Sequence, residues 1–120
     1  MKEERIASYQ RISKGKDIDE SLAVERLILG KYAKDEDIEF VENYVDIHKS
    51  TNEDRPEFNR LIKDIFLGEI DKLVVVGGCD RLSRDIYEID QIENYVNVEY
   101  IIPKVEYIIP KVDYGFEYEN

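Results

Sequence analysis

The sequence predicts one α/β domain of three layers, with helices flanking a mainly parallel β-sheet. Segments of strand character alternate with segments of helical periodicity along the chain, as in strand–helix repeats. Residues 72–76 (KLVVV) form a compact apolar run, which is typical of a parallel strand covered on both faces. A length of 120 residues suits a single domain, and 42% hydrophobic residues can supply one core.

The first half of the chain predicts a strand, a helix and a second strand. Residues 5–10 are the first strand candidate. Residues 21–34 have helical periodicity, with Ser21 near the start and an apolar face formed by Val24, Leu27, Ile28 and Tyr32. Residues 38–45 are rich in β-branched and aromatic side chains and predict a strand.

The second half begins with a polar loop over residues 46–55. Pro56 then suits the first position of a helix, and Gly68 ends that helix. Its buried face is expected to comprise Phe58, Leu61, Ile62 and Ile65. After the strand at 72–76, another helix is marked by Ile86, Ile89, Ile92 and Val96. Residues 98–102 complete the predicted sheet.

The charge pattern argues against a nonspecific nucleic-acid binder, because the chain has 17 basic and 28 acidic residues and a net charge of −11. Residues 87–120 carry 8 acidic and 2 basic residues, so over half of the net negative charge lies in this segment. The single Cys79 excludes an internal disulfide. Because no apolar run reaches about 18 residues and the N-terminus lacks an apolar signal core, we expect a cytoplasmic, soluble protein.

Three polar clusters follow predicted strands: residues 9–13, 46–55 and 80–84. In parallel sheets ligands bind outside the carboxyl ends of the strands, so these clusters are expected to converge. They contain four of the seven arginines, namely Arg11, Arg55, Arg81 and Arg84. The planar guanidinium group matches phosphate oxygens, and a serine among such groups suggests a phosphodiester site.

The same clusters carry a family resemblance. Tyr9-Gln-Arg11-Ile-Ser13 has the pattern Y-x-R-[IV]-S, residues 46–50 have the pattern D-x-x-x-S before an Asp-Arg-Pro at 54–56, and residues 80–84 are D-R-L-S-R. Together, in this order, they resemble the catalytic domain of the serine recombinases, the resolvase/invertase family. The resemblance extends from about residue 6 to about residue 103, and residues 99–120 form a repeat-containing acidic tail.

The resemblance implies site-specific DNA recombination without a metal or a small-molecule cofactor. Ser13 would attack a DNA phosphodiester and form a covalent 5′-phosphoserine, and four subunits would cut, exchange and rejoin the strands. The partners implied are DNA and further copies of the chain. By motif, the phosphate-binding residues would be Arg11, Arg81 and Arg84, with Arg55 as the arginine of a mobile loop. Asp80 would orient an arginine or handle a proton, and the supporting residues would be Tyr9, Asp46 and Ser50.

Three departures from the family pattern bear on this assignment. Family members often have a glutamine where this chain has Glu25, whose carboxylate would repel a phosphate unless it is paired. Thr51 replaces a glycine that usually follows the loop serine. Family members also continue into a long helix and a DNA-binding module. The chain is therefore expected to be either a fragment of a longer recombinase or a truncated relative, and the truncated form could be catalytically silent and act only by association with full-length subunits.

Several residues admit other interpretations. His48 is expected to be a solvated loop residue rather than a metal ligand, and Cys79 a small buried residue rather than a nucleophile. Gly77 and Gly78 follow an apolar strand but lack the third glycine of a dinucleotide turn. A nucleotide-binding signalling domain of flavodoxin-like shape would fit the fold pattern but would leave the arginine clusters unexplained.

The tail contains a direct repeat, EYIIPKV at 99–105 and again at 106–112. Its prolines exclude a continuous helix and favour an edge strand. Because the repeat has an odd period, both copies cannot make the same contacts within one strand. One copy is expected to complete the sheet, and the other is either a duplication without a role or an edge for self-association.

Overall fold

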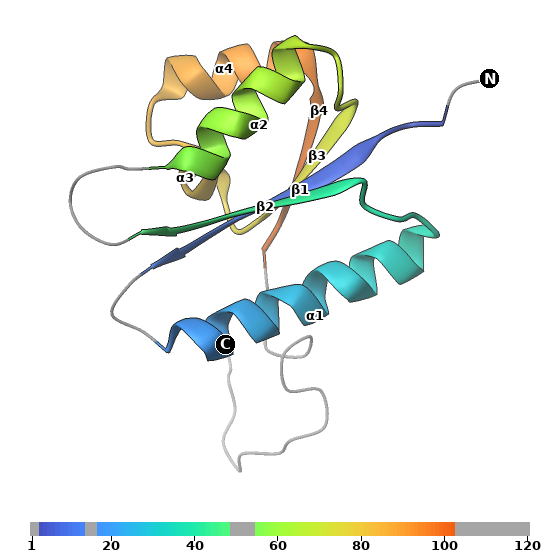
Figure 1. Cartoon of the computed structure of the whole chain (residues 1–120), viewed down its shortest axis with the longest axis vertical. Coiled ribbons are helices and arrows are strands. Elements are labelled where there is room, and N and C mark those ends of the chain that lie inside the picture. Colours follow the sequence, from blue (N-terminus) through green and yellow to red (C-terminus); the bar gives the residue numbers. More distant parts are fainter. Residues whose placement is uncertain (1–2, 14–16, 49–54, 103–120) are drawn as a thin grey trace, which may run out of the picture.

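The fold is a four-stranded sheet in the order β2-β1-β3-β4, in which every neighbouring pair is parallel (Figure 1). This computed structural model describes residues 3–13, 17–48 and 55–102. The strands are β1 (Ile6–Ser13), β2 (Glu42–His48), β3 (Lys72–Val76) and β4 (Asn97–Ile101). The prediction of an α/β domain with a mainly parallel sheet is confirmed.

Helices cover both faces of the sheet, so the expected three layers are present (Figure 1). The long helix α1 (Ile18–Glu36) lies against one face, and α2 (Pro56–Phe66) and α4 (Ile86–Tyr95) lie against the other. A four-residue helix, α3 (Cys79–Leu82), follows β3 directly and was not predicted. Among the helices of the described residues, none is long and apolar enough to cross a membrane.

Two hydrophobic clusters fill the spaces between the layers. The cluster beneath α2 and α4 contains Ala7, Tyr9, Tyr44, Phe58, Leu61, Ile65, Ile70, Leu73, Val75, Leu82, Ile92 and Val96. The cluster beneath α1 contains Ile6, Ile28, Leu29, Val74 and Val76. Successive β3 side chains alternate between these clusters, because neighbouring residues of a strand point to opposite faces. This double coverage explains why β3 is apolar on both faces.

Two predicted core residues are in fact exposed. Leu27 is 71% exposed, because the buried stripe of α1 passes through Ile28 and Leu29 and turns Leu27 away from the sheet. Ile86 is 73% exposed, because it is the first residue of α4 and this helix meets the core only from Ile89 onward. The predicted face of α2 is confirmed, with Ile62 partly buried and the other three members buried.

Several boundaries differ from those predicted. β1 continues to Ser13 rather than ending at residue 10. β2 starts at residue 42 rather than 38, because α1 ends at Asp37 in the left-handed conformation (φ 56°) and the chain then needs four residues to reach the sheet. β2 also ends later than predicted, so Asp46 lies within a strand and not in the polar loop. α1 starts before Ser21, because the Asp17 carboxylate accepts the N–H of Glu20 at 3.0 Å and caps the helix there.

The first copy of the EYIIPKV repeat contributes to β4, which lies at an edge of the described sheet. The expectation that one copy completes the sheet is therefore met by residues 99–101. The second copy lies outside the described residues. Its role in self-association stays a prediction.

Candidate active site

Tyr9, Arg11 and Asp46 lie together near the carboxyl ends of β1 and β2. Arg11 is directly opposite Asp46 in the parallel register, and Tyr9 precedes Arg11 by two residues, so the three share a face of the sheet. All three are buried, with exposures of 0%, 7% and 3% for Tyr9, Arg11 and Asp46. The first two polar clusters therefore meet at the strand ends, as the sequence predicts.

The Asp46 carboxylate joins both strands to α2. It accepts the Tyr9 hydroxyl at 2.8 Å and the backbone N–H groups of Glu57 and Phe58 at 3.0 and 2.8 Å. The two N–H groups belong to the first turn of α2, where helix geometry leaves donors unsatisfied and the helix dipole favours a negative charge. Arg55 at the start of that helix makes no side-chain cap of its own, so Asp46 acts as the cap from a neighbouring strand.

Arg55 extends the same network toward α3. Its Nη2 donates to the Tyr9 hydroxyl oxygen at 3.1 Å and also to the backbone carbonyl of Leu82. Its guanidinium carbon lies 3.8 Å from the centre of the Phe58 ring, which adds a cation–π contact. Burial raises the pKa of Tyr9 far above its ordinary value, and the hydrogen bond to Asp46 acts in the same direction, while Arg55 opposes both. Tyr9 is therefore a neutral phenol that donates to a carboxylate and accepts from a guanidinium.

Arg81 reaches back from α3 to β1 and α1. Its Nη1 donates to the backbone carbonyl of Arg11 at 2.5 Å and lies 3.4 Å from Oε2 of Glu25. The other Glu25 oxygen accepts the side-chain amide of Gln10 at 3.3 Å. Glu25 is only 8% exposed, and this burial raises its pKa, although Gln10 and Arg81 act in the opposite direction. The Glu25 carboxylate is therefore paired with Arg81 and Gln10.

Gly77 gives Arg81 the space for this path. It has φ of 111°, a conformation that side chains disfavour, and a Cβ added there would lie 2.5 Å from Cγ of Arg81. The glycine at the end of β3 thus allows the arginine stem to pass directly over the backbone. Of the two glycines that follow the apolar strand, Gly77 therefore has a local packing role.

The remaining predicted site residues are more scattered. Asp80 in α3 and Arg84 just after it are exposed, and no described hydrogen bond or ion pair links either to the Tyr9–Asp46–Arg55 network. Ser13 is the last residue of β1. Its backbone lies two positions beyond Arg11 and pairs with that of His48 in β2. Ser50 lies outside the described residues.

Two interpretations of single residues were wrong. Cys79 is exposed, because it starts α3 at the surface instead of continuing the buried strand β3. His48 is the last residue of β2 rather than a loop residue, since β2 extends three residues further than predicted. Within the described part of the chain, no group of three or more His, Cys, Asp or Glu side chains is arranged to hold a metal ion.

Sequence reasoning missed Ser83 as a structural member of the third cluster. Ser83 is buried, donates to Glu88 at 2.6 Å and accepts the N–H of Asp85 at 3.0 Å. These bonds fix the turn between α3 and α4. A serine that accepts the N–H two residues along forms an ST-turn, a local pattern that the motif D-R-L-S-R concealed.

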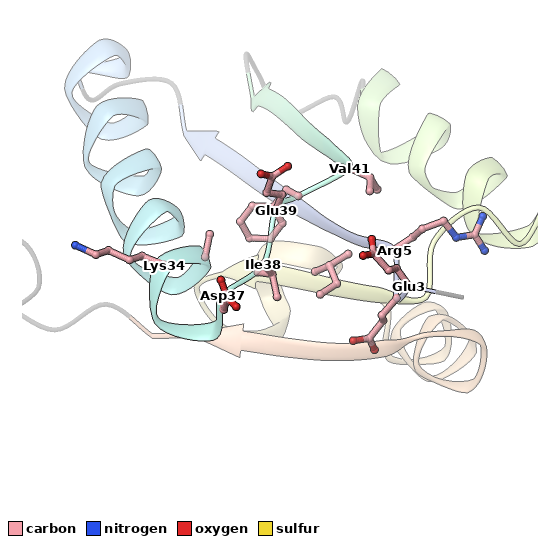
Figure 2. Close-up of a pocket in the computed structure, with 11 residues that line it drawn as sticks. Glu3, Arg5, Lys34, Asp37, Ile38, Glu39 and Val41 are labelled. Atoms are coloured by element: carbon pink, nitrogen blue, oxygen red, sulfur yellow. The ribbon is translucent and has the colours of Figure 1, made fainter. Parts of the chain in front are cut away.

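A separate cavity of about 870 Å³ lies at the opposite, amino-terminal edge of the sheet (Figure 2). It is lined by the start of β1, the end of α1 and the segment before β2, including Glu3, Asp37 and Glu39. Arg5 and Lys34 only partly offset four acidic residues there. A phosphate would be repelled by that lining, so the arginine-bearing carboxyl edge is the better candidate for anion chemistry.

Comparison with known proteins points to one family. Residues 6–99 match the family model of the resolvase N-terminal domain. The N-terminal catalytic domain of TP901-1 integrase is 29% identical, with 79% of this chain and 75% of that chain covered and a TM-score of 0.59. A resolvase family site-specific recombinase from Streptococcus pneumoniae is 25% identical, with coverage of 95% and 79% and a TM-score of 0.55.

A serine recombinase from Sulfolobus solfataricus, 20% identical, shares the fold with a TM-score of 0.64 over 90% of this chain and 76% of that one. A search of curated protein sequences found no match. The family model covers most of the chain, including all three arginine clusters. The chain therefore belongs to the resolvase family, with the fold of its N-terminal catalytic domain.

Proposed function

We propose that this chain is the catalytic domain of a serine recombinase that cleaves and rejoins DNA through a covalent 5′-phosphoserine on Ser13. The resolvase family carries out site-specific DNA recombination, and the chain is similar to the catalytic domain of an integrase. The observation that supports the proposal is that Arg81 donates to the backbone carbonyl of Arg11 and Arg55 to Tyr9 and the carbonyl of Leu82, near the edge where β1 ends in Ser13.

The proposed reaction is a reversible transesterification. The Ser13 oxygen attacks the phosphorus, its proton is taken up by a base or by water, and an O–P bond forms. The bond from phosphorus to the 3′ oxygen breaks, and that oxygen leaves as a 3′-hydroxyl after gaining a proton. Attack by a 3′-hydroxyl on the phosphoserine reverses these changes and rejoins a strand, so no outside energy source is needed. Fixed guanidinium groups would stabilise the negative charge that develops on the phosphoryl oxygens.

The arginines would divide this task according to their surroundings. Arg11 and Arg81 lie nearest the end of β1 and would contact the scissile phosphate. Arg84 is exposed and suits a contact with the flanking DNA backbone. Arg55 is held by Tyr9 and the Leu82 carbonyl, so it would reach a phosphate only by exchanging these contacts.

Asp80 would orient a neighbouring arginine or handle a proton, and its exposure at the start of α3 is compatible with either task. Tyr9 and Asp46 would support the site by fixing the strand ends against α2. Ser50 keeps a supporting role by motif. A net charge of −11 implies that the domain alone holds DNA weakly, so further subunits or a basic module would bring the target in.

The test is to fuse the chain to a sequence-specific DNA-binding module and to incubate it with duplexes carrying paired binding sites. We expect a covalent protein–DNA product on denaturing gels. Mass spectrometry of the digested product should identify Ser13 as the modified residue. Ser13→Ala should abolish the product, whereas Ser21→Ala, on the partly exposed start of α1, should not. A folded, tetramer-forming fusion that gives no product, or a product that survives in Ser13→Ala, would overturn the proposal.

A second candidate is a silent domain that acts by associating with full-length recombinase subunits. The structure offers one observation in its favour, because Arg55 and Arg81 are both committed to contacts within the chain. This function predicts that the domain co-assembles with active subunits and lowers their recombination rate, with no covalent DNA on Ser13. The fusion experiment above separates the two candidates.

A further inference from the structure

We propose that Glu25 is an electrostatic latch on Arg81: when ionised it binds the guanidinium group and weakens its hold on a phosphate, and when neutral it releases that group. Phosphate binding at Arg81 is then coupled to uptake of a proton by Glu25. This inference rests on the proposed function, in which Arg81 is a phosphate-binding residue.

The Glu25 carboxylate contacts the guanidinium group of Arg81, which is the group that would bind a phosphate. Nη1 of Arg81 is shared between Oε2 of Glu25, at 3.4 Å, and the carbonyl oxygen of Arg11, at 2.5 Å. The Arg81 side chain is 37% exposed but that of Glu25 only 10%. An incoming anion can therefore reach the arginine from solvent while the carboxylate stays mostly covered. The two anions would then act on one guanidinium group.

The position of Arg81 is built into the backbone. The absence of a side chain at Gly77 lets the arginine stem pass close to the backbone just after β3, and the side-chain amide of Gln10 on β1 donates to the other oxygen of Glu25 at 3.3 Å. Both partners are thus fixed by neighbours on other elements, so the pair is preorganised and not a chance meeting of two long surface side chains. A fixed ion pair that is partly shielded from water acts more strongly on a nearby charge than an exposed pair does.

The sign of the effect follows from the charges. An ionised Glu25 offsets the charge of Arg81 and repels a phosphate arriving at the same group. A neutral Glu25 removes both effects and can keep its contact with Gln10. Removal of this one negative charge should therefore strengthen anion binding at Arg81. In an ordinary structural ion pair, the main consequence of the same change would be lost stability.

The surroundings of Glu25 favour proton uptake when an anion binds. Burial raises the pKa of this carboxyl, while the Gln10 amide on β1 and the Arg81 charge on α3 lower it. Within the described residues, Arg81 is the charge that acts on Glu25, and the Arg11 group that shares its Nη1 is a neutral carbonyl. A phosphate that takes over Arg81 removes that favourable charge, so the pKa of Glu25 rises further. By linkage, protonation of Glu25 must strengthen phosphate binding by the same factor.

The test measures sulfate binding, because sulfate remains a dianion across the pH range used. The Nε–Hε NMR signal of Arg81, assigned by comparison with Arg81→Lys, is followed during sulfate titrations of the folded chain between pH 5 and pH 8. We expect Glu25→Gln to bind sulfate about tenfold more tightly than the unmodified chain at pH 8. The unmodified chain should approach that affinity as the pH falls, while the affinity of Glu25→Gln changes much less.

Glu20→Gln is the matched control, since Glu20 is an exposed acid in the first turn of the same helix. It removes one negative charge without touching Arg81 and should leave the sulfate affinity within about twofold of the unmodified chain. Circular dichroism and thermal unfolding show whether each variant is folded. An unchanged or weaker affinity in folded Glu25→Gln, or an Arg81 signal that sulfate moves in none of the proteins, would overturn the latch.

Sulfate binding needs neither Ser13 nor DNA cleavage, so the two proposals fail separately. A latch that behaves as expected in a chain without Ser13-dependent cleavage would contradict only the recombinase reaction. If the chain forms the phosphoserine product but Glu25→Gln leaves the sulfate affinity unchanged, only the latch would be contradicted.

Discussion

The Tyr9 hydroxyl donates to the Asp46 carboxylate at 2.8 Å in the interior of the domain, where both side chains are at most 3% exposed. This single carboxylate also accepts the first backbone N–H groups of α2. Two strands and one helix therefore converge on one side chain at the carboxyl edge of the sheet. The position of Arg55, which starts that helix, depends on the same group.

Replacement of Asp46 by Asn should destabilise the domain by about 2 kcal/mol, because an amide cannot accept all three hydrogen bonds and carries no charge for the helix dipole. Urea unfolding followed by circular dichroism measures the change. Asp64→Asn is the control, since Asp64 accepts the hydroxyl of Tyr44 at 2.5 Å from a more exposed position within α2. Equal losses in the two variants would contradict the capping role of Asp46.

Replacement of Gly77 by Ala should displace Arg81 and also strain the backbone. The new Cβ would lie 2.5 Å from Cγ of Arg81, and φ of 111° disfavours any side chain, so we expect a loss of about 2–3 kcal/mol. The Arg81 Nε–Hε NMR signal should shift as well. Gly68→Ala separates the two effects, since Gly68 has φ of 76° but open space around a Cβ. That control should lose about 1–2 kcal/mol and leave the Arg81 signal in place. An unmoved Arg81 signal in Gly77→Ala would contradict the packing argument.

Replacement of Arg55 by Lys should lower stability by about 1 kcal/mol and reduce cleavage by the fused chain, although the charge is kept. Lysine lacks the planar fork that bonds Tyr9 and the Leu82 carbonyl together and stacks on Phe58. Arg60→Lys is a matched change, since Arg60 also lies over a tyrosine ring, at 4.4 Å, but pairs with acids at the surface. It should alter stability by less than about 0.5 kcal/mol. Cleavage at the normal rate in Arg55→Lys would exclude a geometric role for the guanidinium group.

Glu25 should make the stability of the domain depend on pH in a defined direction. Burial raises the pKa of its carboxyl above the ordinary 4.5, so the folded chain holds this proton more tightly than the unfolded chain does. The resulting stability is present below pH 4.5 and is lost as the pH rises through the value in the folded state.

Glu25→Gln stays uncharged, so it should be more stable than the unmodified chain at pH 7. The difference should disappear in acid. Thermal unfolding of both proteins from pH 4 to pH 8 measures this trend. If Glu25→Gln were the less stable protein at pH 7, the ion pair with Arg81 would outweigh the effect of burial.

The elements that were predicted correctly are those with strong local patterns. The helix from Pro56 has a proline at its first position and a regular apolar face, and β3 is apolar over residues 73–76, so both were located from neighbouring residues alone. Leu27 and Ile86 are exposed although the helical periodicity predicts them to be buried. The periodicity identifies the apolar side of a helix, but the packing partner decides which residues on that side are buried. The end of β1 was missed because a charged residue such as Arg11 is not typical of a strand, although tertiary contacts bury it.

The sequence by itself determined the strand–helix alternation, the three polar clusters and the family pattern, because each depends on residues close together in the chain. Only the tertiary structure decided which side chains meet. Tyr9 and Asp46 are 37 residues apart, and Glu25 and Arg81 are 56 apart. Such contacts depend on strand order and register, which place β1 between β2 and β3 and set Arg11 opposite Asp46. No local pattern encodes that placement, because it results from burying the apolar faces of all the elements at once.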